Sequence, residues 1–164
     1  MKQKIFTNCF LVKNGTGGKP SEVCLAMKKR GFGVGMWNGS GGKPNEGESV
    51  EGAAKREVWE EFGIRVLKMD KRAEIDFVLK AEEKIVKMHT FVATEWEGEP
   101  TESEEMKPQW FEVESVPYCQ MWKSDAEWLP EILAGKTIKA AYTYDHEGGE
   151  VVDRRREEVE GFTL

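Results

Sequence analysis

The stretch Gly42-Lys-Pro-Asn-Glu-Gly-Glu-Ser-Val-Glu-Gly-Ala-Ala-Lys-Arg-Glu-Val-Trp-Glu-Glu-Phe-Gly-Ile64 decides how this sequence folds. Ser49 is a favourable helix N-cap and Gly63 stands where a left-handed C-terminal cap belongs, so we expect a helix between them. Apolar side chains recur in this helix at four-residue spacing and form a stripe for a core; they are Val50, Ala54, Val58 and Phe62. The glycine-rich segment before the helix, residues 31–47, is too long for a plain connection, which indicates a functional loop.

Three glutamates lie beside the apolar stripe. Glu57, Glu60 and Glu61 stand at i, i+3 and i+4, so they cover an arc of about 100° on the helix. Three such acids alone are typical of a solvated face, where each close pair repels by a few tenths of a kcal/mol. A divalent cation converts that repulsion into coordination, because Mg²⁺ prefers hard oxygen ligands and completes its shell with water and phosphate.

The acids belong to a longer pattern. Gly42 is followed by five residues and Glu48, then by seven residues and Arg56-Glu57-Val58-Trp59-Glu60-Glu61-Phe62-Gly63-Ile64. This spacing resembles the Nudix box at every constrained position. The resemblance implies a hydrolase that cuts a nucleoside diphosphate linkage with Mg²⁺, or with Mn²⁺ in its place. It gives Glu48 a supporting role between loop and helix, and Arg56 can hold a neighbouring glutamate by a charge-assisted hydrogen bond.

The similarity extends outward from the box. Residues 27–43, 102–111, 121–122 and 128–130 resemble the sanitising branch of the Nudix family, which hydrolyses oxidised purine nucleoside triphosphates to monophosphates. The resemblance implies the α/β/α sandwich of the family, a mixed β-sheet between helices, as a single domain over residues 1–164. It implies the catalytic residues Glu61, Glu57, Glu105 and Arg56. It implies the metal ligands Glu57, Glu60, Glu61, Glu105 and the backbone carbonyl of Gly41.

The resemblance also implies a pocket for the base. Its expected lining is Phe32, Asn38, Phe77, Met106, Trp122, Ser124 and Asp125, with Phe6, Thr7 and Lys28 at the edge. The residue types suit a purine, because aromatic rings stack on bases and an amide both donates and accepts hydrogen bonds. The branch has two adjacent aspartates where this sequence has Ser124-Asp125, so we expect a narrower or shifted choice of modified purine. The alternative role for Ser124 is a helix N-cap.

Short apolar runs separated by turn residues predict strands over residues 5–12, 22–27, 64–69, 73–79, 85–94, 138–144 and 151–154, with a short extended piece at 110–113. A second helix is expected over residues 125–133. Strands with two well-separated helices predict a mixed sheet that carries helices on both faces.

Composition bounds the partners. The formal net charge of −6 opposes binding of long nucleic acids, which needs clustered Lys and Arg. No run approaches the roughly 18 apolar residues of a membrane span. Cys9, Cys24 and Cys119 are few and widely spaced, which fits a reducing compartment, so we expect a cytoplasmic protein with buried cysteines. We expect a monomer, and the resemblance implies a small nucleotide as its substrate.

Two alternatives stay open at this level. One is a Nudix hydrolase with another substrate, such as a dinucleotide, a nucleotide sugar or a capped RNA. The other is a catalytically silent nucleotide-binding module on the same scaffold. The presence of all five charged residues of the box favours an enzyme, since silent relatives are expected to lose the acids.

Overall fold

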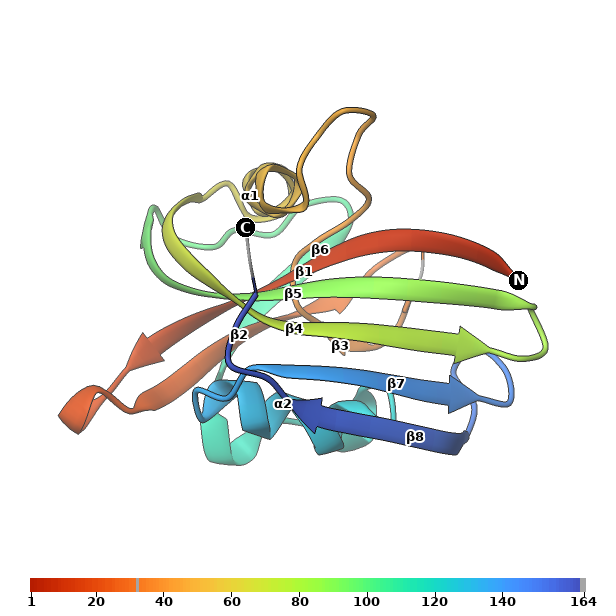
Figure 1. Ribbon diagram of the computed structural model, residues 1–164. Helices are drawn as coiled ribbons and strands as arrows, with labels where there is room; N and C mark the ends of the chain where they lie inside the picture. The colour runs from red at the N-terminus through yellow and green to blue at the C-terminus, as the bar shows by residue number, and fades with distance from the viewer. Residues whose placement is uncertain (32, 163–164) are drawn as a thin grey trace.

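The computed structural model describes residues 1–31 and 33–162. Eight strands of this part form one mixed sheet in the order β3-β2-β1-β5-β4-β7-β8, and β6 pairs with β2 beside this path (Figure 1). The strands are β1 (Lys2–Asn14), β2 (Pro20–Lys28), β3 (Trp37–Asn38), β4 (Arg65–Leu79), β5 (Lys84–Glu97), β6 (Met106–Glu112), β7 (Ile138–Tyr144) and β8 (Val151–Glu158). The helices are α1 (Val50–Phe62) and α2 (Asp125–Leu133), with 3-10 turns at Thr16–Gly18, Val113–Ser115 and Tyr118–Gln120.

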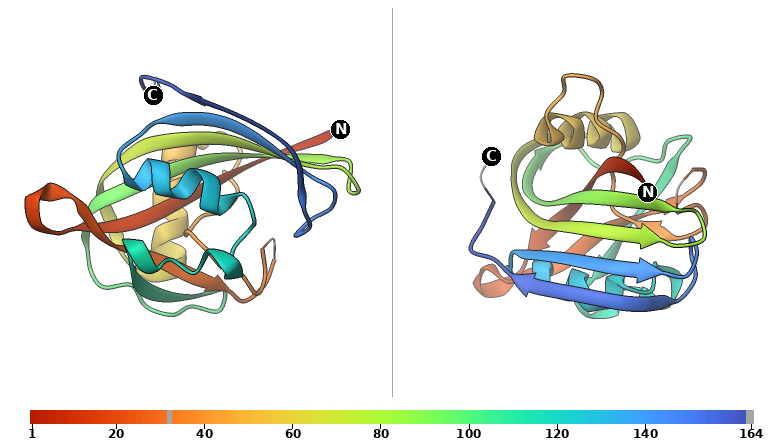
Figure 2. Two further views of the ribbon diagram at one scale, coloured as in Figure 1. Left: turned by 90° about the horizontal axis from the view of Figure 1, so that it is seen from below. Right: turned by 45° about the vertical axis from the view of Figure 1, so that its right-hand side comes forward.

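Helices α1 and α2 lie on opposite faces of the sheet (Figures 1 and 2). The sheet is mixed because β1 runs parallel to β5 and β4 runs parallel to β7, whereas the other neighbours are antiparallel. The predicted mixed sheet between helices is therefore confirmed. No helix in the described part of the chain is long and apolar enough to cross a bilayer.

Alternation along the strands builds a separate core on each face. Phe10 and Val12 of β1 point to the α2 side, where they join Trp128 and Leu129 of the helix. The intervening residues of β1 point to the α1 side and pack with Val58 and Phe62; they are Cys9 and Leu11. Because successive side chains of a strand face opposite ways, one sheet anchors both helices.

The central helix has the predicted ends. The Ser49 hydroxyl accepts a hydrogen bond from the Gly52 N–H at 3.0 Å, and Gly63 adopts a left-handed conformation with φ 71°. The Gly63 N–H closes the last turn on the Trp59 carbonyl at 2.9 Å. These two caps satisfy backbone groups that a helix end leaves open, so they fix where α1 begins and ends.

The structure corrects two expectations. The predicted strands 64–69 and 73–79 form one continuous strand, β4, because irregularities in its pairing with β5 between Val66 and Ala73 let the chain bend without leaving the sheet. Cys9 and Cys24 are buried as expected, whereas Cys119 is exposed because it lies in a 3-10 turn at the surface.

Candidate active site

Arg56 organises the acids of α1. Its guanidinium donates to both carboxylate oxygens of Glu48, each at 2.9 Å, and to Glu57 at 2.9 Å and Glu60 at 3.2 Å. A further N–H donates to the Lys43 carbonyl at 3.0 Å. Arg56 therefore ties the helix to the glycine-rich loop, as its fork of donors allows. The main cause that lowers the pKa of Glu48 is this hydrogen bond from Arg56.

Glu61 is the buried member of the acidic trio, with 3% of its surface exposed. One carboxylate oxygen accepts hydrogen bonds from the Ser40 hydroxyl at 2.7 Å and the Gly41 N–H at 2.8 Å. The other oxygen, Oε2, is buried without a hydrogen-bond partner among the described residues. Burial raises the pKa of Glu61 to about 7, and burial also raises the pKa of Glu57.

Two glycines let the loop pass between β1 and α1. A Cβ on Gly41 would lie 1.9 Å from the Thr7 carbonyl oxygen, and a Cβ on Gly42 would lie 2.5 Å from the Glu57 carboxyl carbon. Thr7 fixes the same loop, because its N–H donates to the Gly42 carbonyl at 2.8 Å and its hydroxyl accepts from the Gly42 N–H at 3.3 Å. The close approach therefore requires glycine at both positions.

The acids of α1 share a cavity with the loop before β6. It has a volume of about 280 Å³ and is lined by Arg30, Glu57, Glu60, Glu61, Ser103, Glu104 and Glu105. Arg30 pairs with Glu105 at 3.2 Å and lies 3.9 Å from Glu104. The sequence-predicted acids Glu57, Glu60, Glu61 and Glu105 thus meet at one cavity although two elements supply them.

This donor set fits a divalent cation. Among the described residues, no three acidic, His or Cys side chains lie close enough together to form a complete metal site by themselves. Mg²⁺ needs no such cage, because it is held by one or two carboxylates together with water and phosphate oxygens. The unpaired Oε2 of Glu61 and the raised pKa values of Glu57 and Glu61 mark carboxylates that lack a cationic partner strong enough to offset burial.

A second, narrow pocket lies on the other face of the sheet, against α2. Its lining is Asn8, Phe10, Asn38, Gly39, Phe77, Met88, Trp122, Asp125 and Trp128. Four of the residues expected to contact the base are among them, namely Asn38, Phe77, Trp122 and Asp125. The free volume is about 20 Å³, close to that of one water, so a purine enters only when the lining side chains move apart.

Asp125 is the ionisable group of this pocket. Burial raises its pKa to about 8, and the neighbouring Trp128 side chain offsets part of that rise. The carboxyl is therefore largely protonated at pH 7 and can donate a hydrogen bond. The rings of Phe77 and Trp122 lie nearby with their centroids 6.1 Å apart, and they form the apolar walls.

Ser124 does not cap α2 with its side chain and is absent from the pocket lining. Its hydroxyl lies 2.7 Å from the Tyr144 hydroxyl, which also accepts from the Ser124 N–H at 2.8 Å. Ser124 is fully buried, so this pair ties the start of α2 to β7. Tyr144 was not anticipated, because only the fold brings β7 beside Ser124.

The remaining predicted residues lie in three places. Lys28 and Phe6 line a further cavity with Lys4, Arg30 and Lys43. Met106 is fully buried in the core under α1 and does not line the base pocket. Phe32 lies outside the described residues. The positions of Ser40 and Asn8 in these sites could not be predicted from the sequence, because only tertiary contacts place them there.

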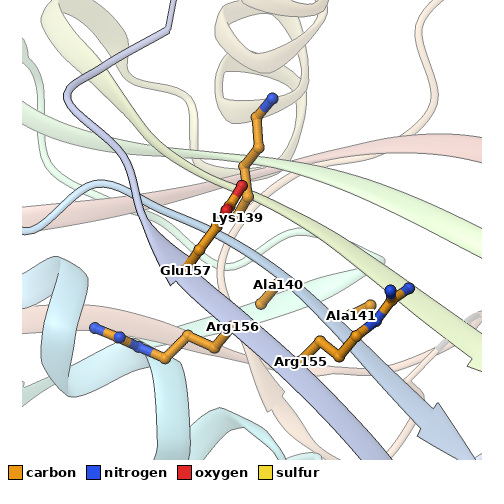
Figure 3. A pocket seen from close by; sticks show the side chains of 6 residues that line it. All are labelled: Lys139, Ala140, Ala141, Arg155, Arg156 and Glu157. Atoms are coloured by element: carbon orange, nitrogen blue, oxygen red, sulfur yellow. The ribbon is translucent and has the colours of Figure 1, made fainter.

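Another cavity, of about 580 Å³, lies on the β7–β8 ribbon, away from all of these residues (Figure 3). Its lining includes Lys139, Arg155, Arg156 and Glu157. Figure 3 shows that Arg155 and Arg156 leave the strand in opposite directions, and Arg156 pairs with Glu131 of α2 at 2.5 Å. This cavity holds none of the predicted site residues.

Residues 6–132 match the model of the NUDIX domain, so the protein belongs to the Nudix family. The oxidized purine nucleoside triphosphate hydrolase of Danio rerio is 43% identical over 143 residues, which cover 87% of this chain and 90% of the relative. The protein of the same name from Mus musculus is 46% identical over 118 residues, or 72% and 76% of the two chains. The crystal structure of a MutT protein from Bacillus halodurans superposes with a TM-score of 0.79 at 30% identity, covering 94% of this chain and 97% of that one. Nudix hydrolases generally need divalent cations.

Proposed function

We propose that the protein hydrolyses oxidised or otherwise modified purine nucleoside triphosphates to monophosphate and pyrophosphate, with Mg²⁺ as its metal. One observation carries this proposal: the acidic cavity adjoins a basic one. Arg30 and Glu105 line both, so a phosphate chain held at the acids continues directly toward lysines. The names of the relatives from Danio rerio and Mus musculus support the same substrate class.

The basic cavity suits the charge of a triphosphate. Its cations are Lys4, Lys28, Arg30, Lys43 and Lys84, against the carboxylates of Glu105 and Glu147. Arg30 pairs with Glu105 and Lys84 pairs with Glu147 at 3.8 Å, whereas Lys4, Lys28 and Lys43 form no salt bridge within the described part of the chain. Neighbouring ammonium groups, Lys43 first, lower the pKa of Lys4, which shows that positive charge is crowded there.

The side chains divide the work. A bound cation neutralises phosphate oxygens and lowers the pKa of an attacking water. Glu57, Glu60, Glu61 and Glu105, which line one cavity, would supply the carboxylates that hold it. Arg56 orients Glu57 and Glu60 and keeps Glu48 and the loop in place. Across the sheet, Phe77 and Trp122 enclose the base, and Asp125 donates to it.

We also propose that residues 1–164 form a single Nudix domain that works as a cytoplasmic monomer on a small nucleotide. The family model covers most of this length, which supports one domain. The net charge of −6 supports a small substrate over long nucleic acids.

The test is a product analysis on a panel of nucleotides. The protein is incubated with Mg²⁺ and 8-oxo-dGTP, 2-oxo-dATP, a methylated purine triphosphate, dGTP or ADP-ribose, and the products are separated by ion-exchange chromatography. We expect a modified purine triphosphate to give the highest kcat/KM, with monophosphate and pyrophosphate as products and with no turnover in EDTA. A nucleoside diphosphate with orthophosphate as the sole products would contradict the proposal, as would preference for ADP-ribose.

A charge-matched pair of variants tests the lysine cavity. Lys43→Gln removes a cation that lies over the Phe6 ring, 5.4 Å from its centroid, whereas Lys68→Gln removes an exposed cation of β4 outside all of these cavities. We expect Lys43→Gln to raise KM by about tenfold, the value of one charge-assisted contact. Lys68→Gln should leave KM unchanged.

A further inference from the structure

Asn8 is a polar side chain in an apolar row. The residues of β1 that point toward α2 include Phe6, Phe10 and Val12, and all three belong to the core on that face or pack against it. Asn8 occupies the same row and lines the pocket of Phe77, Trp122 and Asp125. Because a strand repeats every two residues, the amide points into the pocket and not toward α1.

The Asn8 amide oxygen is buried and has no hydrogen-bond partner within the described residues. The neighbouring strand, β5, carries a second buried polar group without a partner among these residues. Thr90 is the register partner of Asn8 on β5, so both side chains lie on the same face, and the Thr90 hydroxyl is likewise buried without a partner. Two adjacent polar groups left unsatisfied inside a folded protein are unfavourable, which calls for a ligand or an ordered water at this point.

The other polar side chains of the pocket are more restricted. Asn38 donates its amide N–H groups to the carbonyls of Met36 at 2.9 Å and Gly33 at 3.3 Å, so these donors already serve the glycine-rich loop. Gly39 packs directly on Asn8, since a Cβ there would lie 2.1 Å from the Asn8 amide oxygen. The Gly39 backbone therefore packs against the Asn8 amide, whose oxygen has no hydrogen-bond partner among the described residues.

We propose that Asn8 is a specificity-determining residue whose amide pairs with a base edge that carries an N–H donor next to a C=O acceptor. Oxidation adds such an edge on a side of the purine where the unmodified base has none: position 8 of guanine gains a carbonyl beside N7–H, and position 2 of adenine gains one beside N1–H. The amide matches this edge with one acceptor and one donor. The proposal deepens the function proposed above and rests on it.

The test compares Asn8→Leu with the exposed control Asn14→Leu at the end of β1. For each protein, kcat/KM is measured for 8-oxo-dGTP, dGTP, 2-oxo-dATP and dATP. In Asn8→Leu we expect the ratio of oxidised to unmodified substrate to fall by about tenfold or more for at least one pair, since a site built to pair with a polar edge discriminates strongly. Asn14→Leu should keep both ratios.

Two further measurements keep the result interpretable. Thermal unfolding should show a Tm for Asn8→Leu equal to or above that of the wild type, because leucine removes an unpaired buried amide, so lost selectivity is separated from misfolding. Binding of 8-oxo-dGMP and dGMP in EDTA, followed by calorimetry, reports on the base without hydrolysis. If the wild type hydrolyses none of the four substrates yet Asn8→Leu loses the preference for 8-oxo-dGMP, the proposed function fails and the role of Asn8 stands. Ratios that stay within twofold in both assays overturn the role of Asn8.

Discussion

Replacing Glu61 with glutamine tests two effects of one carboxyl group: its burial, which changes the stability of the protein with pH, and its role in metal-dependent turnover. In the metal-free protein, burial raises the pKa of Glu61 to about 7. The unfolded chain releases this proton near pH ~4.3, whereas the folded protein keeps it until near neutrality. Glu61 therefore contributes stability at low pH, and this contribution is lost as the pH rises toward the folded pKa.

The magnitude follows from the pKa. Each pH unit in this window corresponds to about 1.4 kcal/mol, so between pH 5.5 and pH 8 the wild type loses about 2 kcal/mol from this group. Glutamine does not titrate, and its carbonyl oxygen can still accept from the Ser40 hydroxyl and the Gly41 N–H. Any constant packing cost of its NH₂ group cancels when the two pH values are compared.

Urea unfolding in EDTA at both pH values measures this difference. Relative to wild type, Glu61→Gln should gain about 2 kcal/mol of unfolding free energy on going from pH 5.5 to pH 8. With Mg²⁺ present, kcat of the variant should fall by about a thousandfold, because several kcal/mol of metal-assisted charge stabilisation are lost. A gap that does not change with pH refutes the reasoning from burial, and near-normal kcat in a folded variant refutes the metal assignment.

Three further outcomes are expected. Glu105→Gln should lower kcat at least tenfold more than Glu104→Gln does, since the Glu104 side chain is 90% exposed. Equal small effects in steady-state assays would show that neither acid takes part in metal binding. Ser124→Ala should lower the unfolding free energy by about 1–2 kcal/mol in urea titrations, because the buried Tyr144 hydroxyl loses the Ser124 hydroxyl and keeps only the backbone N–H of residue 124 as a partner. Gly41→Ala should cost more than about 3 kcal/mol and abolish turnover, since its Cβ meets backbone; a stable, active variant would exclude that close approach.

Much of the fold could be predicted because local signals agreed with the tertiary structure. The bounds of α1 followed from Ser49 and Gly63, and the residues of α2 and β7 match their predicted ranges. The division of β4 into two strands was wrong for a physical reason. The polar run Asp70-Lys71-Arg72 reads as a break in the sequence, yet in the sheet its irregular pairing keeps the strand continuous.

The candidate site likewise contains some features that local sequence predicts and others that depend on tertiary contacts. The spacing of Glu57, Glu60 and Glu61 on one helix is local, so the sequence could predict that they lie together. The roles of Ser40 toward Glu61 and of Tyr144 toward Ser124 could not be predicted, because residues 20 or more positions apart meet only after the sheet has formed. The local sequence around a hydroxyl or amide side chain does not show which residue it will contact in the folded protein.

The central position of β1 has a consequence for biosynthesis. β1 lies between β2 and β5, and its parallel partner, residues 84–97, is made some 80 residues later. A nascent chain that already contains the complete box therefore still lacks one wall of the sheet on which α1 rests. Parallel strands so far apart in the sequence pair slowly, because the entropy of closing the long loop between them is lost before any stabilising contact forms. A chain paused on the ribosome before β5 emerges would expose the apolar stripe of α1, which makes this interval the time when a chaperone is most useful.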